Sequence, residues 1–333
     1  MTKYYFIRHF VAVLLGCLLS AYTYAQHITE FLFTETAPDY LIPTMQANAK
    51  ALFAEINSAY DQKKSLLTLS QSNITSEARE RIQNLWKTSH FYCTKTGVLE
   101  RILKMQNGDF QVRNIPVFFA QGKTDEHKYQ HVVLEFTRDG KISDLYIAIT
   151  TQQYIKIMES LINDVSDARH RQMIVYLVEN YRTAYNSKDL SFLNAIFSEN
   201  ALIITGKVLT PQKRGDAPIA INNQKIEYSV LNKEQYLTKL QNVFNNNSYI
   251  NIKFEDIVVK QHEENSNIYG VTLRQIWNAE KYNDEGWLFL IFDYENEDKP
   301  KIWVRTWQPL EVNGVKYYYG TYEIFGLGDF RYR

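Results

Sequence analysis

Isolated polar side chains stand among large apolar residues in the last third of the sequence, and these residues are the best suited to small-molecule chemistry. Asp293 is a carboxylate that, in apolar surroundings, would suit proton abstraction beside a carbonyl. Arg274 and Arg305 are candidates for binding an anionic group. Together with Tyr185 and Trp277, they form the predicted ligand-pocket residues.

A structural interpretation of the same residues stays open. The arginines would then pair with Asp or Glu on a solvated face, while the tryptophans would fill or cover the core. Strand alternation groups Gln275 with Trp277 and sets Arg274 on the other face, but a slip of one residue inverts which face is inward. Asp256 is an alternative to Asp293 as the buried carboxylate. Because neither acid has a matched acid–base partner, we assign no catalytic residue.

The histidines and the cysteine in the middle of the chain favour neither metal nor covalent chemistry. His127 and His131 have the i, i+4 spacing of a helical zinc site, but His131 is expected to open a strand, along which four residues span about 13 Å. His90 and Cys93 would lie on opposite faces of a strand, so we interpret Cys93 as a buried structural thiol. No phosphate-loop, dinucleotide-binding or serine-hydrolase motif occurs, and we expect no metal and no cofactor.

The overall composition is that of a globular protein. The 333 residues are 45% hydrophobic and 22% charged, with 37 basic and 37 acidic side chains. Length divided by about 150 residues suggests two domains. A net charge of zero lacks the broad positive field that nucleic-acid binding usually needs, so we expect no nucleic-acid partner.

The first 25 residues are typical of an export signal. Lys3 and Arg8 precede ten apolar residues, Phe10–Leu19, and small residues end at Ala25. Ten residues cannot cross a bilayer core of about 30 Å, so we predict a periplasmic or secreted mature chain without a transmembrane segment. In an alternative cut, the lipobox-like residues before Cys17 would leave Cys17 acylated and the protein tethered to a membrane.

Residues 26–152 are predicted to form an N-terminal α+β domain. Apolar residues recur at helical spacing over Thr44–Tyr60, and Thr75 is an N-cap candidate for a second helix. The pattern then alternates as in strands, and Asn107-Gly108 and Asp139-Gly140 mark two hairpin turns. The order is therefore helix, helix, then antiparallel meander.

Residues 153–333 repeat this order. Helical spacing covers 154–162 and 166–185, and Asp189 is the cap candidate of a short helix. A strand at 201–205, a polar loop at 211–223 and a helix at 233–244 follow, and then strand patterns at 249–260, 268–278, 286–294, 301–309 and 315–325. Helices first and sheet afterwards, twice over, predict two tandem α+β domains with a boundary near residues 150–153.

The second half contains a segment that resembles the opening of nuclear transport factor 2-like (SnoaL-like) domains. The segment is Val178-Glu179-Asn180-Tyr181-Arg182-Thr183-Ala184-Tyr185-Asn186-Ser187-Lys188-Asp189, followed by Leu193, Ile196-Phe197 and Ala201-Leu202-Ile203-Ile204. The match extends more loosely through Trp307-Gln308-Pro309. The resemblance implies a cystatin-like cone, in which helices pack on a curved antiparallel sheet and leave a pocket between them. We interpret residues 26–152 as a diverged copy of this fold.

Two functions are compatible with these observations. The first is an exported, non-catalytic binding module whose cone pocket or exposed sheet binds a small molecule, a glycan or a protein. The second is a small-molecule isomerase, dehydratase or hydrolase that works by general acid–base catalysis in the C-terminal cone. We favour the first, since the resemblance covers enzymes and non-catalytic modules alike and no acid–base pair is evident. Many relatives of this fold pair through their sheets, so a homodimer is considered on the resemblance alone.

Overall fold

The structure is a computed structural model that describes residues 28–105, 107–121, 124–159, 165–209, 224–321 and 324–331. The expected export signal, Cys17 and the whole of the expected polar loop at 211–223 lie outside the described residues. Export and lipid attachment therefore stay predictions.

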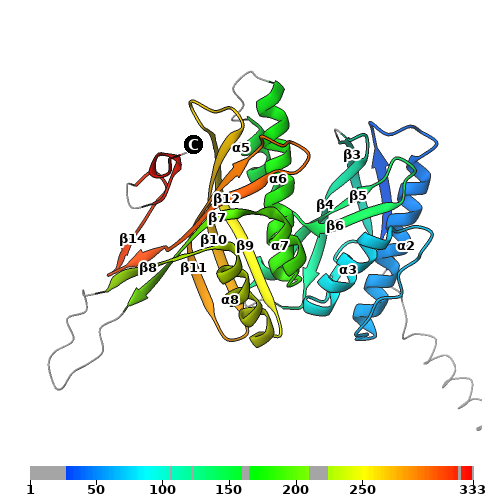
Figure 1. Cartoon of the computed structure of the whole chain (residues 1–333). Coiled ribbons are helices and arrows are strands. Elements are labelled where there is room, and N and C mark those ends of the chain that lie inside the picture. Colours follow the sequence, from blue (N-terminus) through cyan, green and yellow to red (C-terminus); the bar gives the residue numbers. More distant parts are fainter. Residues whose placement is uncertain are drawn as a thin grey trace, which may run out of the picture.

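Helices and sheets alternate as layers along the molecule (Figure 1). The helices α2 (Ile42–Asp61) and α3 (Ser76–Thr88) cover one face of a first sheet. The long helix α6 (Val165–Asn186) lies between the first sheet and a second one and contacts both. The helix α8 (Lys233–Asn246) packs on the same face of the second sheet as α6, and the C-terminal segment lies against its outer face.

The first sheet is built from the first half of the chain. Its strands are β1 (Glu30–Thr34), β2 (Phe91–Cys93), β3 (Gly97–Lys104), β4 (Phe110–Phe119), β5 (Tyr129–Phe136) and β6 (Ile142–Ile147), with the short helix α4 (Asp125–Lys128) before β5. Their order is β1-β3-β4-β5-β6, and β2 pairs with β4. The predicted hairpins β3–β4 and β5–β6 are confirmed, with Gly108 and Gly140 at positive φ in their turns. The sequence does not predict β1 or β2, which have no hairpin signal beside them.

The second sheet is built from the second half. The helices α5 (Thr151–Glu159), α6 and α7 (Leu190–Ile196) precede it. Its strands are β7 (Phe197–Leu209), β8 (Lys225–Leu231), β9 (Ile250–Gln261), β10 (Ile268–Ala279), β11 (Asn283–Asp293) and β12 (Lys301–Pro309), in the order β8-β7-β12-β11-β10-β9. The short pair β13 (Glu311–Val312) and β14 (Val315–Lys316) and a 3₁₀ helix, Leu327–Asp329, end the described chain.

The predicted α+β class, with helices packed on two sheets, is confirmed. Each six-stranded sheet is antiparallel except for one parallel pair, β1–β3 in the first and β7–β12 in the second. The prediction of a strand over 315–325 is wrong, because β14 ends at Lys316 and the chain turns at Gly320, where φ is 91°. The sequence also does not predict β8.

Side-chain caps set the start of three helices. Thr75 accepts a hydrogen bond from Ala78 N at 3.2 Å, and Asp189 accepts one from Phe192 N at 2.9 Å, so both predicted caps are confirmed. Asn232 starts α8 with a reciprocal capping box to Gln235. Asp189 and Asn232 thus fix where α7 and α8 begin.

β-bulges interrupt the ladders of the second sheet. The register between β9 and β10 shifts beside Asp256, whose φ is 49°, and Trp303 is the extra residue of β12 opposite β11. A bulge bends its strand and increases the local twist. The sheet therefore curves around α6 and α8, as the cone resemblance implied.

Two apolar cores divide the chain close to residue 148. The first core draws on residues 31–147 and the second on residues 149–302. Between them, the buried Arg182 of α6 donates hydrogen bonds to Ala148 O at 2.9 Å and Ile252 O at 2.6 Å. The two halves are thus joined by buried polar contacts, and a domain boundary near residues 150–153 stays a prediction.

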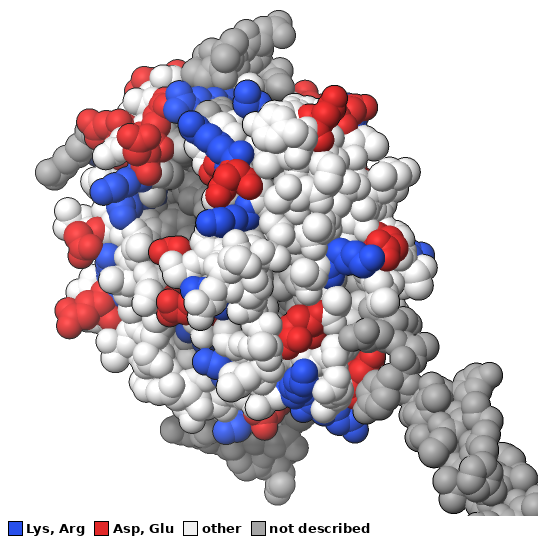
Figure 2. Space-filling model, turned by 90° about the vertical axis from the view of Figure 1, so that its right-hand side faces the viewer, with Lys and Arg blue, Asp and Glu red and all other residues white. Residues whose placement is uncertain are grey.

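The charged side chains on the face of the first half are mixed. Lys and Arg are interspersed with Asp and Glu over this face, and neither sign forms a continuous patch there (Figure 2). Among the described helices, none is both long and apolar enough to span a membrane.

Candidate ligand-binding site

A cavity of about 550 Å³ opens between the curved face of the second sheet and the helices α6 and α8. The strands β7, β10, β11 and β12 form one wall, and Tyr185 of α6 and Tyr236 of α8 form the opposite one. The cavity falls at the position where the resemblance implied a pocket. Residues from seven elements meet in it, so no contiguous motif in the sequence encodes it.

Strand alternation decides which side chains reach this cavity. On β10, Gln275 and Trp277 face the helices, while Arg274, directly before Gln275, faces outward. On β12 the bulge at Trp303 reverses the alternation, so Arg305 and Trp307 face the cavity although Ile302 already faces the same core. Trp303 itself is 40% exposed.

Arg305 is the central charged group of the site. Its side chain is only 5% exposed, its Nε donates to the Tyr181 hydroxyl at 3.1 Å, and its guanidinium carbon lies 4.9 Å from the centre of the Tyr236 ring. Within the described part of the chain, no carboxylate pairs with Arg305, and its Nη1 has no hydrogen-bond partner. A buried guanidinium is normally paired, so Arg305 is an exception that calls for a partner.

Three tyrosine hydroxyls extend from this arginine along the helical wall. The hydroxyls of Tyr181 and Tyr185 are 2.9 Å apart, and that of Tyr185 is hydrogen-bonded to that of Tyr236. Burial raises the pKa of Tyr185 well above its usual value, so its hydroxyl stays neutral. Two hydrogen bonds among three hydroxyls use two of their three protons. One O–H therefore remains free to donate, next to the guanidinium of Arg305, which has donors only.

The remaining charged groups of the cavity wall are Lys207, Lys239 and Asp284. Both lysines are exposed, whereas Asp284 is mostly screened from solvent and accepts hydrogen bonds from the Tyr282 hydroxyl and from Glu285 N. Burial raises the pKa of Asp284. Together with Arg305, the described lining carries three basic groups and one acid, an electrostatic excess that favours an anion.

The Trp307 ring is held against the floor of the cavity by a glycine. A Cβ atom at position 286 would lie 2.6 Å from the Trp307 ring and 2.1 Å from Gln308 O, distances that no side chain tolerates. Gly286 is therefore required by this close approach. The indole N–H groups of Trp277 and Trp307 have no hydrogen-bond partner among the described residues.

The structure brings three of the five predicted pocket residues together: Tyr185, Trp277 and Arg305 line the cavity. Arg274 lies on the outer face, where it forms ion pairs with three acids, Glu255, Asp256 and Glu285. The structural interpretation thus applies to Arg274, and it also accounts for Asp256.

Asp293 is also outside the cavity. It ends β11 on the face opposite to the cavity, because it alternates with Phe289 and Ile291, which pack under the C-terminal segment. Its Oδ1 accepts a hydrogen bond from Glu295 N at 2.7 Å. Its role in the structure is therefore to shape the turn after the strand.

The sequence analysis did not identify Tyr236, Asp284 or Tyr181 as residues of the site. Tyr181 and Tyr185 are one helical turn apart, which could have been read as a shared face, but Tyr236 belongs to another helix. Asp284 lies before the expected strand at 286–294, whereas β11 begins at Asn283 and carries Asp284 into the sheet. The meeting of these residues depends on tertiary packing.

His127 lies in α4, His131 in β5 and Cys93 at the end of β2. Within the described residues, no group of three or more His, Cys, Asp or Glu side chains is arranged to hold a metal ion. Cys93 is 2% exposed, and burial raises the pKa of its thiol. The interpretation of Cys93 as a buried thiol is confirmed.

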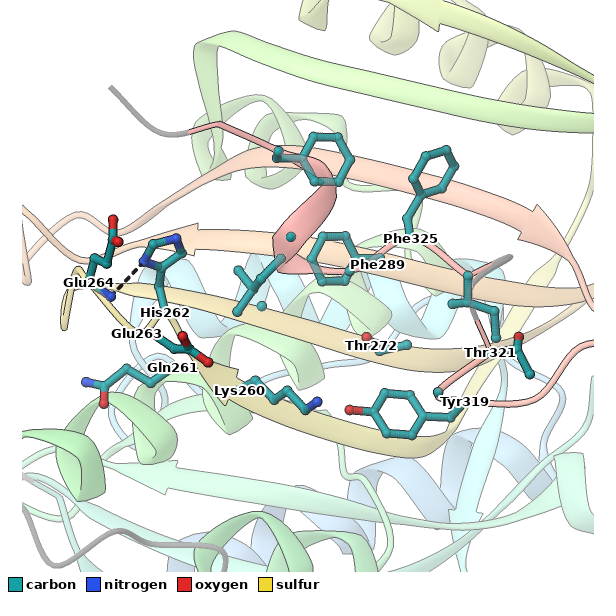
Figure 3. Close-up of a pocket in the computed structure, with 17 residues that line it drawn as sticks. Lys260, Gln261, His262, Glu263, Glu264, Thr272, Phe289, Tyr319, Thr321 and Phe325 are labelled. Atoms are coloured by element: carbon teal, nitrogen blue, oxygen red, sulfur yellow. Dashed lines mark hydrogen bonds between the residues drawn. The ribbon is translucent and has the colours of Figure 1, made fainter.

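A second hollow, of about 620 Å³, lies on the outer face of the same sheet (Figure 3). The end of β9, with Lys260 and His262, forms one side, and Tyr319 and Phe325 of the C-terminal segment form the other. Residues 322 and 323, which connect the two parts of this segment, are outside the described residues. The cavity at Arg305 holds a buried guanidinium that has no carboxylate partner among the described residues, and it is therefore the stronger candidate.

No protein-family model matches the sequence, and no curated protein matches it. Similar solved structures include a proposed dehydratase of the nuclear transport factor 2-like family from Streptomyces avermitilis, at 10% identity and a TM-score of 0.31, covering 42% of this chain and 96% of its own. A nuclear transport factor 2-like protein of unknown function from Pseudomonas putida KT2440 has 9% identity and a TM-score of 0.31, covering 42% and 87%. Bd1075 of Bdellovibrio bacteriovorus has 11% identity and a TM-score of 0.33, covering 63% and 92%. The similar solved structures thus include members of the superfamily that the sequence resembles. At these identities and TM-scores, we assign no residue role in this chain from them.

Proposed function

We propose that the chain is an exported, non-catalytic binding module, and that its second domain binds a small anionic molecule with an aromatic or apolar body beside Arg305. The proposal rests on the unpaired, buried guanidinium of Arg305. Removing a charge from water without a partner is strongly unfavourable. The carboxylate or other anionic group of a ligand would supply the missing partner.

Other buried arginines in the chain illustrate the contrast. Arg113 pairs with Glu179, and Arg171 pairs with Asp167, each at a short distance and with both side chains buried. The buried Arg182 instead donates to backbone carbonyl oxygens and to the Gln130 side chain. These buried arginines thus have acids or carbonyl oxygens as acceptors. Arg305 has tyrosine hydroxyls and a ring face instead, and it lines a cavity.

The size and the walls of the cavity support an aromatic or apolar body for the ligand. A volume of about 550 Å³ lies within the usual range for small-molecule sites, about 300 to 1,000 Å³. Trp277, Trp307 and Leu240 provide flat and aliphatic surfaces around the polar centre. Exposed Lys207 and Lys239 would attract an anion to the opening.

Export is proposed on the basis of the first 25 residues, with attachment through Cys17 as the alternative. A glycan or a protein as the ligand, and a homodimer formed through the sheet, are further proposals for which we name no individual residues. We propose no nucleic-acid partner and no cofactor.

The test is calorimetric titration with 2-naphthoate and with its neutral isostere 2-naphthamide. A charged hydrogen bond contributes about 1.5 to 3 kcal/mol. We therefore expect Arg305→Met to weaken naphthoate binding by about 10- to 150-fold and to leave the weak binding of naphthamide unchanged. Arg274→Met, which removes a surface arginine, is the matched control and should bind like the wild type. Equal affinity of wild type and Arg305→Met for naphthoate would overturn the proposal.

Asp284 favours a second candidate function, general acid–base catalysis in the same cavity. Its raised pKa and its place in the same lining as the donors of Arg305 and Tyr236 are what such an enzyme needs. If a ligand is found to be converted, Asp284→Asn should abolish turnover while naphthoate binding persists. Conversion that is unaffected by Asp284→Asn would exclude this residue as the base.

A further inference from the structure

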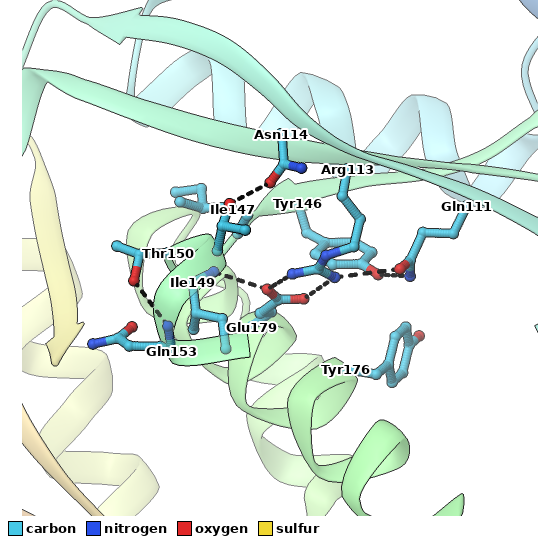
Figure 4. Close-up of polar contacts among 12 residues, drawn as sticks. Gln111, Arg113, Asn114, Tyr146, Ile147, Ile149, Thr150, Gln153, Tyr176 and Glu179 are labelled. Atoms are coloured by element: carbon cyan, nitrogen blue, oxygen red, sulfur yellow. Dashed lines mark hydrogen bonds and ion pairs between the residues drawn. The ribbon is translucent and has the colours of Figure 1, made fainter. Parts of the chain in front are cut away.

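A separate cavity of about 440 Å³ lies between the two halves of the chain, away from Arg305. The first sheet contributes Gln111, Arg113 and Glu135, and the helices α5 and α6 contribute Tyr154 and Tyr176. Neither half forms this cavity alone. Its residues lie around the polar contacts shown in Figure 4.

Glu135 is the group in this cavity whose bonding is incomplete. Its residue is 8% exposed, and its Oε1 accepts hydrogen bonds from the Tyr146 hydroxyl at 2.7 Å and from Gln111 Nε2 at 3.3 Å. Its Oε2 has no partner in the described part of the structure. Because Glu135 lines the cavity, its second oxygen is accessible to a hydrogen-bond donor that binds there.

The nearby arginines do not supply that donor. Arg113 donates from two nitrogens to Glu179, at 3.0 Å from Nη1 and 2.5 Å from Nη2. Arg81 is paired with the buried Asp144 at 2.5 Å. Each arginine is therefore neutralised by its own acid, and neither forms an ion pair with Glu135 among the described residues.

The opening of the cavity is acidic overall. Glu297 and Asp298, from the segment after β11, line it together with Arg169, and Arg169 is already paired with Glu297 at 2.8 Å. Tyr154 of α5 and Tyr176 and Met173 of α6 add aromatic and apolar surface to the lining. The guanidinium carbon of Arg113 lies 4.6 Å from the centre of the Tyr154 ring, which leaves Tyr176 and Met173 as the freer apolar surface. These surroundings suit a cation that has a hydrocarbon body.

We propose that this cavity binds a small organic ammonium ion, whose N–H groups donate to Glu135 Oε2 and whose hydrocarbon part packs against Tyr154, Tyr176 and Met173. An ammonium group has donors only, which complements an oxygen that only accepts. The site is distinct from the anion site at Arg305, and its ligand has the opposite charge. The proposal is therefore independent of the proposed function.

Binding should require ionised Glu135. Burial, followed by the charge of Asp144, raises the pKa of Glu135 to about 7, while the hydrogen bonds from Tyr146 and Gln111 and the charge of Arg81 lower it. The charged or titratable groups that face Glu135 are Asp144 and Tyr146 on β6, Arg81 on α3, Arg113 on β4, and Tyr176 and Glu179 on α6. An alkylammonium group keeps its proton up to about pH 10. The affinity should thus be highest near pH 8.

The experiment is calorimetric titration of methylammonium and phenethylammonium chloride into the full mature chain at pH 8. We expect at least one of them to bind, with a ten-fold or greater loss of affinity in Glu135→Gln and a similar loss on lowering the pH to 5.5. Glu263→Gln, a change at an exposed acid on the outer face of the second sheet, is the control and should bind like the wild type. The neutral isostere 2-phenylethanol should bind at least ten-fold more weakly than phenethylammonium.

The proposal is overturned if neither ammonium ion binds the wild type at millimolar concentration. It is also overturned if Glu135→Gln binds phenethylammonium as tightly as the wild type does, or if the wild type binds 2-phenylethanol as tightly as phenethylammonium. Near-ultraviolet circular dichroism of each variant establishes that it is folded. Should Glu135→Gln fail to fold, Glu135→Asp keeps the charge but withdraws it by one methylene, and unchanged affinity in that variant would also contradict the proposal.

Discussion

Arg113 and Glu179 form a two-pronged ion pair that joins the first sheet to the long helix of the second half. The side chain of Arg113 is 8% exposed and that of Glu179 is fully buried. Glu179 Oε1 also accepts a hydrogen bond from Ile149 N at 2.8 Å. A bulge at Asn114, where φ is 62°, reverses the alternation of β4, so Gln111 and Arg113 face α6 while Ile115 faces the first core.

Glu179→Gln should therefore destabilise the protein strongly. The substitution leaves Arg113 charged and buried without an acid, and breaking such a pair removes about 3 to 5 kcal/mol of unfolding free energy. Chemical denaturation measures the change. As a control, Glu35→Gln removes an exposed ion pair with Arg101 and should change stability by less than about 1 kcal/mol. A loss below about 1 kcal/mol in Glu179→Gln would show that the pair does not hold the halves together.

Arg305→Met should have the opposite effect on stability from Arg113→Met. Arg305 is buried without a carboxylate, so an apolar side chain of similar volume should leave the unfolding free energy unchanged or raise it by up to about 2 kcal/mol. Arg113→Met instead leaves Glu179 unpaired and should lower it by about 3 kcal/mol or more. Thermal and chemical unfolding of both variants provide the comparison. If Arg305→Met were the less stable of the two, Arg305 would have a structural role.

Glu135 should make stability fall as the pH rises. Its pKa is about 7 in the folded chain, against 4.5 in an unfolded one. Below pH 4.5 the carboxyl is protonated in both states; between pH 4.5 and 7 the folded state binds more protons, so the unfolding free energy decreases with pH. The total decrease due to Glu135 is at most about 3 kcal/mol.

The difference in unfolding free energy between wild type and Glu135→Gln isolates this contribution. The buried Asp144 also has a raised pKa, from burial first, and its charge acts on Glu135, so the difference reports Glu135 together with its coupling to Asp144. We expect the variant to gain relative to the wild type as the pH rises from 4.5 to 8. A difference that is constant over this range would mean that Glu135 titrates near its ordinary value.

Cys93 should be unreactive in the folded chain. Its thiol is buried, donates to Lys95 O at 3.6 Å and has a raised pKa, so little thiolate forms at neutral pH. In a chain that begins at Gln26, where Cys93 is the only cysteine, a disulfide-exchange reagent should label it at least about 100-fold more slowly in buffer than in denaturant. Rapid labelling of the native chain would revive the nucleophile interpretation with His90.

Local signals in the sequence were sufficient for most of the helices and hairpins. Thr75 and Asp189 cap helices where predicted, and the turns at Gly108 and Gly140 connect the expected strands. These features depend on a few neighbouring residues, and a helix cap or a hairpin turn is satisfied within its own segment. Strands such as β1 and β8 have partners that are far away or lack a tight turn, so local reasoning does not find them.

The buried acids between the two halves of the chain could be predicted from the sequence only in part. Single acids inside apolar runs, Glu135 in 132–136 and Glu179 in 174–181, are visible in the sequence as anomalies. What they contact is not, because Arg113 is separated from Glu179 by 66 residues and reaches it through a bulge.

The amino-acid order by itself determined most of the helices, the hairpins β3–β4 and β5–β6, the alternation of each strand, and the chemical nature of Arg305 and Asp293. Tertiary structure decided that Arg305 lies inside the cavity and Asp293 outside it. The extra residue Trp303 reverses which side chains of β12 face the cavity, whereas β11 has no extra residue before Asp293. The physical reason is that inward and outward are properties of the paired sheet and of the helices that cover it. A strand considered alone has two equivalent faces.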